Sequence, residues 1–177
     1  MFLFNYNSAK INLKLKIYIS LVLIFLLISC FLILKKINEK KRDEKIINTI
    51  PEFAFITLKN ISFNDNNILS KKSRIIINHF SPNCEHCQYM AGEFIKDSQK
   101  LKGIQILMIT STDSASTAKF KRDYKLSLLP NIIILRDTNY QFQKTFGTGV
   151  VPSFFIYEHN KLVKKVIGET LIENIIN

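Results

Sequence analysis

The chain has 177 residues, of which 47% are hydrophobic and 22% charged, so it is neither collagen-like nor extensively disordered and has the length for one domain with an appendage. Its formal net charge is +11, and much of the excess lies near the N-terminus, where residues 1–45 hold nine basic and three acidic side chains. Basic residues in that position suit lipid headgroups, and the sequence has no zinc-knuckle or aromatic–basic RNA motif, so nucleic acid is not expected as a partner.

The N-terminal part consists of a basic segment, residues 1–16, and an apolar run, residues 17–34, without a charged residue. Eighteen apolar residues flanked by lysines are close to the minimum for crossing a bilayer, which predicts a single transmembrane helix. Leu27-Ile-Ser-Cys30 also fits the lipobox of a lipoprotein signal, with Cys30 as the acylated residue. The apolar residues that continue after Cys30 favour the uncleaved anchor.

Residues 35–50 are rich in charge and are predicted to form a stalk that separates the membrane from a domain at residues 51–177. The domain begins with an alternating run at residues 53–58, which predicts a strand, and residues 61–63 are placed to pair with it as a hairpin. Residues 64–73 are predicted to be a polar loop.

Strand-like and helix-like segments alternate over the rest of the chain. The continuous apolar runs at 74–80 and 104–110 have the length of buried central strands. Further strands are predicted at 131–135, 153–157 and 161–167, and helices at 88–101, 115–124 and 170–176. This order predicts an α/β domain with a central mixed sheet and helices on both faces.

The feature that carries chemistry is the CxxC motif Cys84-Glu85-His86-Cys87, placed where a predicted strand ends and a helix begins. Cys84 would be the N-cap residue of that helix, where unpaired backbone N–H groups and the helix dipole favour a thiolate. Cys87 follows one turn later, within reach to close a disulfide. The pattern predicts dithiol–disulfide exchange.

Three segments together resemble a thioredoxin fold: Phe80-Ser-Pro-Asn-Cys84-Glu85-His86-Cys87-Gln88, Val151-Pro152-Ser153-Phe154-Phe155, and Gly168 after the last predicted strand. More narrowly, residues 51–177 resemble the membrane-tethered TlpA-like (ResA-type) thiol–disulfide oxidoreductases of the AhpC/TSA-redoxin grouping. A CxxC alone also occurs in zinc sites, and the downstream Val-Pro makes the match more specific.

The resemblance implies a cis peptide bond before Pro152, packed beside the disulfide, and a backbone at Val151 that binds the extended chain of a substrate. Cys84, as the more exposed cysteine, is expected to be the nucleophile, and Cys87 the resolving residue. Expected partners are protein thiols or disulfides and a membrane-bound thiol that donates electrons. No metal and no cofactor are expected.

The sequence departs from the family pattern at two positions. Asn78 stands where thioredoxins bury a proton-accepting aspartate, and Met90 stands where ResA-type enzymes have a glutamate. Proton transfer would then fall to Glu85, to Glu93 or to water. The neighbouring His79 lies in an apolar strand and is expected to be a core histidine with its polar atoms paired.

Two residues inside the motif are expected to tune its potential in opposite directions. A protonated His86 stabilises a neighbouring thiolate, whereas the charge of Glu85 disfavours one. The direction of electron flow is therefore not determined by these residues, and the family analogy alone favours a reductant of extracytoplasmic thiols.

The orientation in the membrane involves a similar conflict. Six Lys and Arg residues lie within residues 35–45 and three lysines precede the apolar run, which favours a cytoplasmic domain. N-terminal anchors commonly deliver the following domain outward, and a lipoprotein signal would require it. The redox chemistry favours the inner membrane with the domain facing the periplasm.

Three other functions fit parts of the sequence. A thiol peroxidase would use Ser81, three residues before Cys84, but the expected upstream proline and a clear arginine partner are missing. A copper-binding or delivery protein could use the two thiolates, although related copper chaperones space their cysteines more widely. A non-catalytic interaction module would not need Cys84.

Overall fold

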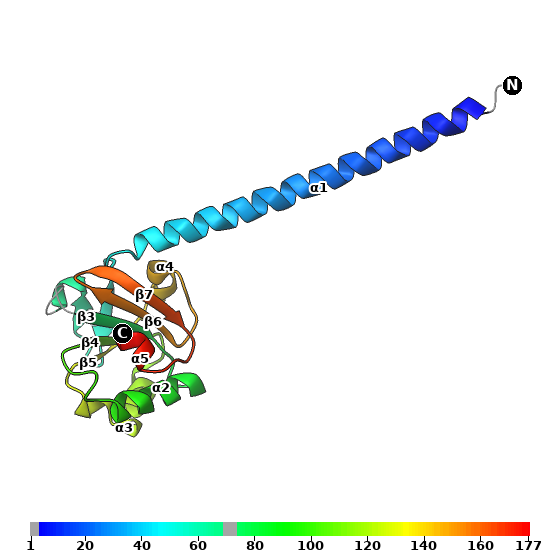
Figure 1. Cartoon of the computed structure of the whole chain (residues 1–177). Coiled ribbons are helices and arrows are strands. Elements are labelled where there is room, and N and C mark those ends of the chain that lie inside the picture. Colours follow the sequence, from blue (N-terminus) through cyan, green and yellow to red (C-terminus); the bar gives the residue numbers. More distant parts are fainter. Residues whose placement is uncertain (1–3, 69–73) are drawn as a thin grey trace. The chain divides into compact units, whose positions relative to one another are not determined.

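The computed structural model describes residues 4–68 and 74–177 (Figure 1). Residues 1–3 of the predicted basic segment and residues 69–73 of the predicted loop lie outside the described residues. The chain divides into two compact units, Met1–Arg42 and Asp43–Asn177.

The first unit consists of most of helix α1, Phe4–Ile46. Within it, the segment Leu15–Asn38 has a mean hydropathy of 3.0 and is long and apolar enough to cross a membrane. None of this segment is buried in the protein, and large side chains such as Phe25 and Leu27 are exposed. An uncovered apolar surface of this size fits membrane anchoring.

The second unit is built on one seven-stranded sheet with the strand order β2-β1-β5-β4-β3-β6-β7. Strands β3, β4 and β5 are parallel, and the four other strands join the sheet antiparallel to their neighbours. The strands are β1 Ala54–Thr57, β2 Ser62–Asn64, β3 Arg74–His79, β4 Gln105–Thr110, β5 Ile132–Arg136, β6 Ser153–Glu158 and β7 Lys161–Ile167. Each predicted strand is present, and each of its ends lies within one residue of the expected position.

Helices cover both faces of this sheet (Figure 1). One face packs against α2 (Glu85–Lys96), α3 (Ser114–Asp123) and α5 (Glu173–Ile176). The other face packs against α4 (Phe142–Phe146) and the segment before β1. Two short 3-10 turns, η1 (Asp65–Asn67) and η2 (Leu126–Leu128), complete the fold. The predicted α/β class, with a mixed sheet flanked by helices, is confirmed.

Successive residues of β3 explain why this strand is central. Ile75 and Ile77 point into the core on the α4 face, Ile76 points into the core on the α2 face, and all three are fully buried. Because neighbouring side chains of a strand point to opposite faces, a strand covered on both sides reads as one continuous apolar run.

Three helices differ from the prediction. The last helix, α5, begins at Glu173 rather than at Thr170. The helix after the CxxC motif ends at Lys96 rather than at Leu101, and the following residues form tighter turns, with Leu101 donating to Ser98. Leu101 is nevertheless fully buried, which explains its helix-like apolar signal. Helix α4 was not predicted, because it has only five residues and no capping residue directly before it.

The folded unit also includes the last residues of the predicted stalk. Ile47 and Ile50 are buried in the core on the α4 face. The hydroxyl of Tyr157 donates to the carbonyl oxygen of Ile47 at 3.1 Å, and Thr49 pairs with Lys161 in an isolated β-bridge. Residues 47–50 are therefore attached to the edge of the sheet formed by β6 and β7.

Candidate redox site

The first cysteine of the motif is the N-cap residue of α2. Cys84 has an extended backbone (φ −94°, ψ 119°), and its carbonyl oxygen accepts the first helical hydrogen bond, from Gln88 N at 3.0 Å. Its side chain is half-buried and makes no capping hydrogen bond. Its sulfur thus lies at the positive end of the helix dipole, which favours a negative charge. The predicted position of Cys84 is confirmed.

The second cysteine is in a different environment. Cys87 is 2% exposed and packs in the core on the α2 face with Phe80 and Met90. Burial raises the pKa of the Cys87 thiol to about 12, and the hydrogen bond from Ser81 N to its sulfur, at 3.5 Å, opposes this shift only in part. Both cysteines of the motif are free thiols in the structure.

The downstream Val-Pro segment lies against the first cysteine. The peptide bond between Val151 and Pro152 is cis, and the carbonyl oxygen of Val151 lies 3.9 Å from the sulfur of Cys84. The structure therefore brings together residues that are 67 positions apart in the sequence. The role of Val151 and Pro152 in substrate binding stays a prediction.

The positions at which the family places a carboxylate hold uncharged, buried side chains. Asn78 is 2% exposed, and its Nδ2 donates to the carbonyl oxygens of Ser153 at 3.1 Å and His79 at 3.3 Å. Met90 is also 2% exposed, inside the core. Glu93 is six residues beyond Cys87, about 9 Å along the helix, and pairs with Lys96. A proton acceptor for Cys87 must therefore come from elsewhere.

The two residues between the cysteines are at the surface. Glu85 is exposed in the first turn of α2. His86 Nδ1 lies 2.7 Å from a carboxylate oxygen of Glu169, and both side chains are largely exposed. Glu169 was not among the predicted site residues, although it directly follows Gly168, which the family resemblance includes. Gly168 has a positive φ of 92°, and its N–H donates to the carbonyl oxygen of Pro152 at 2.8 Å.

Ser81, which a peroxidase would use, has another role in this structure. Its hydroxyl oxygen accepts from the N–H of Asn83 at 3.4 Å, and its own N–H donates to the sulfur of Cys87. Within residues 4–68 and 74–177, no three His, Cys, Asp or Glu side chains are grouped so as to hold a metal ion.

A groove of about 380 Å³ borders the CxxC turn. One wall comes from the turn and the start of α2, and the other comes from α3 and its C-terminal end. The lining residues are Pro82, Asn83, Gln88, Ser116, Lys119, Phe120, Asp123 and Tyr124. Gln88 supports the turn, because its Nε2 donates to the carbonyl oxygen of Pro82 at 2.9 Å.

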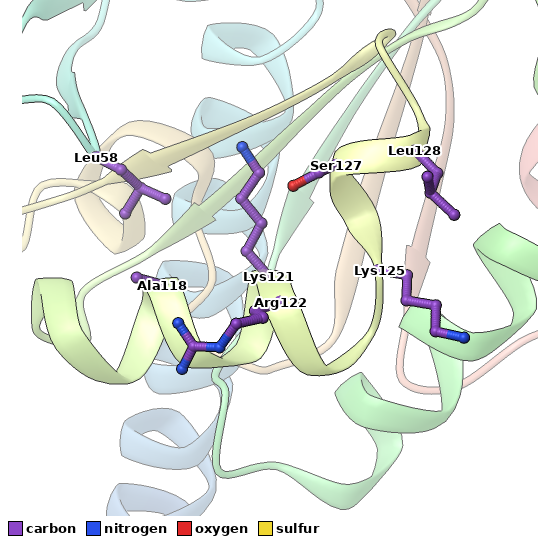
Figure 2. A pocket seen from close by; sticks show the side chains of 7 residues that line it. All are labelled: Leu58, Ala118, Lys121, Arg122, Lys125, Ser127 and Leu128. Carbon is purple, nitrogen blue, oxygen red and sulfur yellow. The ribbon is translucent and has the colours of Figure 1, made fainter.

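A second pocket, of about 470 Å³, lies between the turn after β1, the end of α3 and η2 (Figure 2). Three basic side chains line it, those of Lys121, Arg122 and Lys125, and all three extend in different directions (Figure 2). Because the three charges do not converge on one point, this pocket does not have the geometry of an anion-binding site.

The comparisons with known proteins agree with this geometry. The sequence model of the thioredoxin family matches residues 54–148, more than half of the chain. The chain therefore belongs to the thioredoxin family, and its Cys84–Cys87 pair at the head of α2 is what a thiol–disulfide oxidoreductase of that family requires. No curated protein matches the sequence.

Solved structures share the fold at low sequence identity. One is a secreted disulfide oxidoreductase of Mycobacterium tuberculosis, described as homologous to DsbE of E. coli, with 17% identity, a TM-score of 0.58, and coverage of 72% of this chain and 89% of that one. Another is StoA of Bacillus subtilis, with 16% identity, a TM-score of 0.54, and coverage of 73% and 96%. A peroxiredoxin-like protein of Aquifex aeolicus has 14% identity, a TM-score of 0.59, and coverage of 73% and 82%. At these identities the likeness shows the fold.

Proposed function

We propose that the protein is a membrane-tethered thiol–disulfide oxidoreductase of the TlpA-like, ResA-type kind that reduces disulfides of extracytoplasmic proteins. The observation that carries this proposal is the difference between the two sulfurs. Cys84 is half-buried at the head of α2, beside the backbone of Val151, whereas Cys87 is buried. A protein substrate can reach the first sulfur, and the second can react only with the first.

The reaction begins when the Cys84 thiolate attacks one sulfur of the substrate disulfide. That S–S bond breaks, a Cys84–substrate disulfide forms, and the other substrate sulfur leaves as a thiolate. Cys87 then loses its proton and attacks the sulfur of Cys84, which releases the second substrate sulfur and forms the Cys84–Cys87 disulfide. Two electrons pass from the protein to the substrate, which gains two protons and leaves as a dithiol.

The proton of Cys87 has no protein acceptor at the position of Asn78, because a side-chain amide accepts no proton at neutral pH. The raised pKa of Cys87 keeps this thiol protonated until the mixed disulfide has formed. The departing substrate thiolate is a base of suitable strength, and we assign it, directly or through water, as the proton acceptor.

The contact between His86 and Glu169 is compatible with the reducing direction. A protonated His86 would stabilise the Cys84 thiolate and so make the disulfide form a stronger oxidant. The Glu169 carboxylate, 2.7 Å from the ring, offsets that positive charge, and the exposed Glu85 adds a second negative charge. We therefore assign Glu85 and His86 as tuning residues whose net effect is small.

The helix α1 supports the tether and the location. Its segment Leu15–Asn38 is uncovered by the protein. We propose that it anchors the protein in the inner membrane with the redox domain on the periplasmic side, where disulfides form and persist. Each turnover leaves the Cys84–Cys87 disulfide, and a membrane-bound thiol in the same membrane would reduce it again.

The reduction potential of the Cys84–Cys87 pair tests the direction. The full-length protein in detergent micelles is equilibrated with glutathione buffers, and the oxidised fraction is measured by thiol alkylation and mass spectrometry. A potential near that of thioredoxin, about −270 mV, is expected together with reduction of insulin disulfides. A potential near about −120 mV would overturn the reducing direction and indicate disulfide formation.

The orientation is tested with a membrane-impermeant maleimide on intact cells that express the full chain. Cys84 is expected to be labelled without lysis, and the Cys84→Ser variant is the matched control because it leaves Cys87 and Cys30 in place. Labelling of Cys84 only after lysis would place the domain in the cytoplasm, as the flanking charges alone favour.

A further inference from the structure

The loop that contains the cis-proline is held by three groups that bind its carbonyl oxygens, two of them side chains of β3 and the third the backbone N–H of the residue after β7. The carbonyl oxygen of Val150 lies 3.3 Å from Nδ1 of His79, that of Pro152 accepts from Gly168 N, and that of Ser153 accepts from Nδ2 of Asn78. Only the carbonyl oxygen of Val151 in this segment faces the Cys84 sulfur. Among the described residues, no group accepts a hydrogen bond from the Val151 N–H.

Two of these three donors are consecutive side chains of β3. Asn78 and His79 point to opposite faces of the sheet, because side chains alternate along a strand. Both are buried, with exposed fractions of 2% and 9%. They reach the loop on either side of the Val151–Pro152 peptide bond, one at Val150 and one at Ser153.

His79 is held in one position on the α4 face. Its ring stacks on that of Phe142, with centroids 4.1 Å apart and planes 13° apart. Phe142 is fixed in turn, because its N–H donates to the buried carboxylate of Asp137 at 2.7 Å. A carbonyl oxygen can only accept, so His79 must carry a proton on Nδ1 to bind Val150.

Burial lowers the pKa of His79, and the Val150 carbonyl and the nearby Asp137 charge oppose that shift. The side chain is thus a neutral imidazole that donates through Nδ1. Val150 itself is 52% exposed, so water could satisfy a carbonyl in this loop without any protein donor. A buried imidazole differs from water because its position is fixed, so its hydrogen bond to Val150 restricts where the loop can lie.

Asn78 acts in the same way from the α2 face. An amide can donate to the Ser153 carbonyl, whereas an ionised carboxylate at this position would face that carbonyl with two acceptors. The departure from the family pattern at Asn78 therefore replaces a proton acceptor with a donor to the loop.

We propose that Asn78 and His79 are positioning residues that hold the segment from Val150 to Ser153 so that the backbone of Val151 stays free and aligned for the substrate chain beside Cys84. The proposal rests on the proposed function, since the substrate is a protein disulfide. It assigns the two side chains to substrate alignment rather than to the chemistry of the sulfurs.

The first test is the kinetics of the full-length protein in micelles with oxidised insulin. His79→Phe keeps a ring to stack on Phe142 and removes the donor, and Asn78→Leu removes the donor at nearly constant volume. Each is expected to raise KM about tenfold, the equivalent of one buried hydrogen bond, with kcat and the Cys84–Cys87 reduction potential nearly unchanged. His79→Asn returns an amide donor near the position of Nδ1 and is expected to restore much of the KM.

The matched control is Asn131→Leu. Nδ2 of Asn131 donates to the carbonyl oxygens of Leu101 and Ile104 at 2.9 and 2.8 Å, so this variant loses hydrogen bonds of the same kind at the other end of the sheet. It is expected to lower stability and leave KM unchanged. An unchanged KM in His79→Phe and Asn78→Leu, or an equal rise in Asn131→Leu, would overturn the proposal.

The second test needs neither a variant nor activity. Nitrogen-15 NMR of the imidazole in the wild-type protein distinguishes the two neutral tautomers, and the proton of His79 is expected on Nδ1. A proton on Nε2 at neutral pH would overturn the positioning role of His79 even if the variants fail to fold. If the wild-type protein reduces no disulfide while His79 has the Nδ1 proton, the proposed function fails and the hydrogen bond stands.

Discussion

The two faces of the sheet differ in the ionisable groups that they bury next to the cysteine pair. On the α2 face the buried ionisable group is the Cys87 thiol, with Asn78 and Met90 where an acid could have stood. On the α4 face, His79 and Asp137 are both buried, and they fix the loop and the short helix. The α2 face carries the redox chemistry, and the α4 face carries two buried polar side chains that hydrogen-bond the loop and the start of α4.

The largest expected effect is a loss of activity from substitutions on the α2 face, and it distinguishes the roles of the two cysteines. Cys84→Ser is expected to reduce disulfide turnover to below about one hundredth of the wild-type rate, because a hydroxyl does not replace a thiolate nucleophile. Cys87→Ser keeps the first attack and loses the resolving step, so a mixed disulfide with the substrate should accumulate on non-reducing gels. Accumulation in Cys84→Ser instead would reverse the assigned roles.

The Cys87 thiol on the α2 face should make the folded protein less stable at alkaline pH. The unfolded Cys87 thiol titrates near pH 9, whereas burial raises its pKa to about 12 in the folded protein. Between these values the folded state keeps a proton that the unfolded state has lost, so the free energy of unfolding falls as pH rises, by up to about 1.4 kcal/mol per pH unit. Urea titrations of the reduced protein at pH 8 to 10 measure this slope.

Cys87→Ala is the control for this loss of stability at alkaline pH. The variant retains the buried Tyr157, whose pKa is also raised by burial. The slope that remains in this variant belongs to other groups. If wild type and Cys87→Ala have the same slope, the Cys87 thiol is not the titrating group.

On the α4 face, the largest loss of stability is expected from removing the Asp137 carboxylate, which accepts hydrogen bonds from the N-terminal end of α4. Asp137 is 2% exposed and accepts from the N–H groups of Gln141 and Phe142 at 2.9 and 2.7 Å. Asp137→Ala leaves both donors unpaired and is expected to cost about 2 kcal/mol of unfolding free energy. Asp137→Asn retains one acceptor and should lose less; a larger loss in Asp137→Asn would contradict this account.

The smallest expected effect is a loss of stability at acidic pH, which His79 on the α4 face causes. Burial lowers the pKa of His79, so below about pH 6.5 the unfolded chain binds a proton that the folded protein does not. The free energy of unfolding should therefore fall as pH falls, by at most about 1.4 kcal/mol per pH unit. His79→Phe is expected to remove this slope in urea titrations between pH 7 and 5, and a persistent slope would assign it to other groups.

Much of this architecture is predictable from the sequence because the strands that build it are covered on both sides. Five of the six residues of β3 and five of the six residues of β4 are buried, and four residues separate the end of β3 from the CxxC motif. The N-cap position of Cys84 and the placement of Val151 beside it followed from these elements and from the family resemblance.

The remaining features depend on contacts between distant residues. Helix α4 has its N-terminal donors satisfied by Asp137, four and five residues earlier, so no local capping signal precedes Phe142. The pairing of His86 with Glu169 spans 83 residues and depends on the turn at Gly168. Such contacts have no periodicity in the sequence and appear only when the chain is folded.

The attachment of residues 47–50 determines at which end of the sheet the chain joins the folded unit. The Tyr157 hydroxyl that binds the Ile47 carbonyl belongs to the same strand as Ser153. The two residues lie at opposite ends of β6, about 13 Å apart along it. The chain thus joins the folded unit at the end of the sheet remote from the cysteine pair. Tension on the chain at residues 47–50 would therefore act on that remote end of β6.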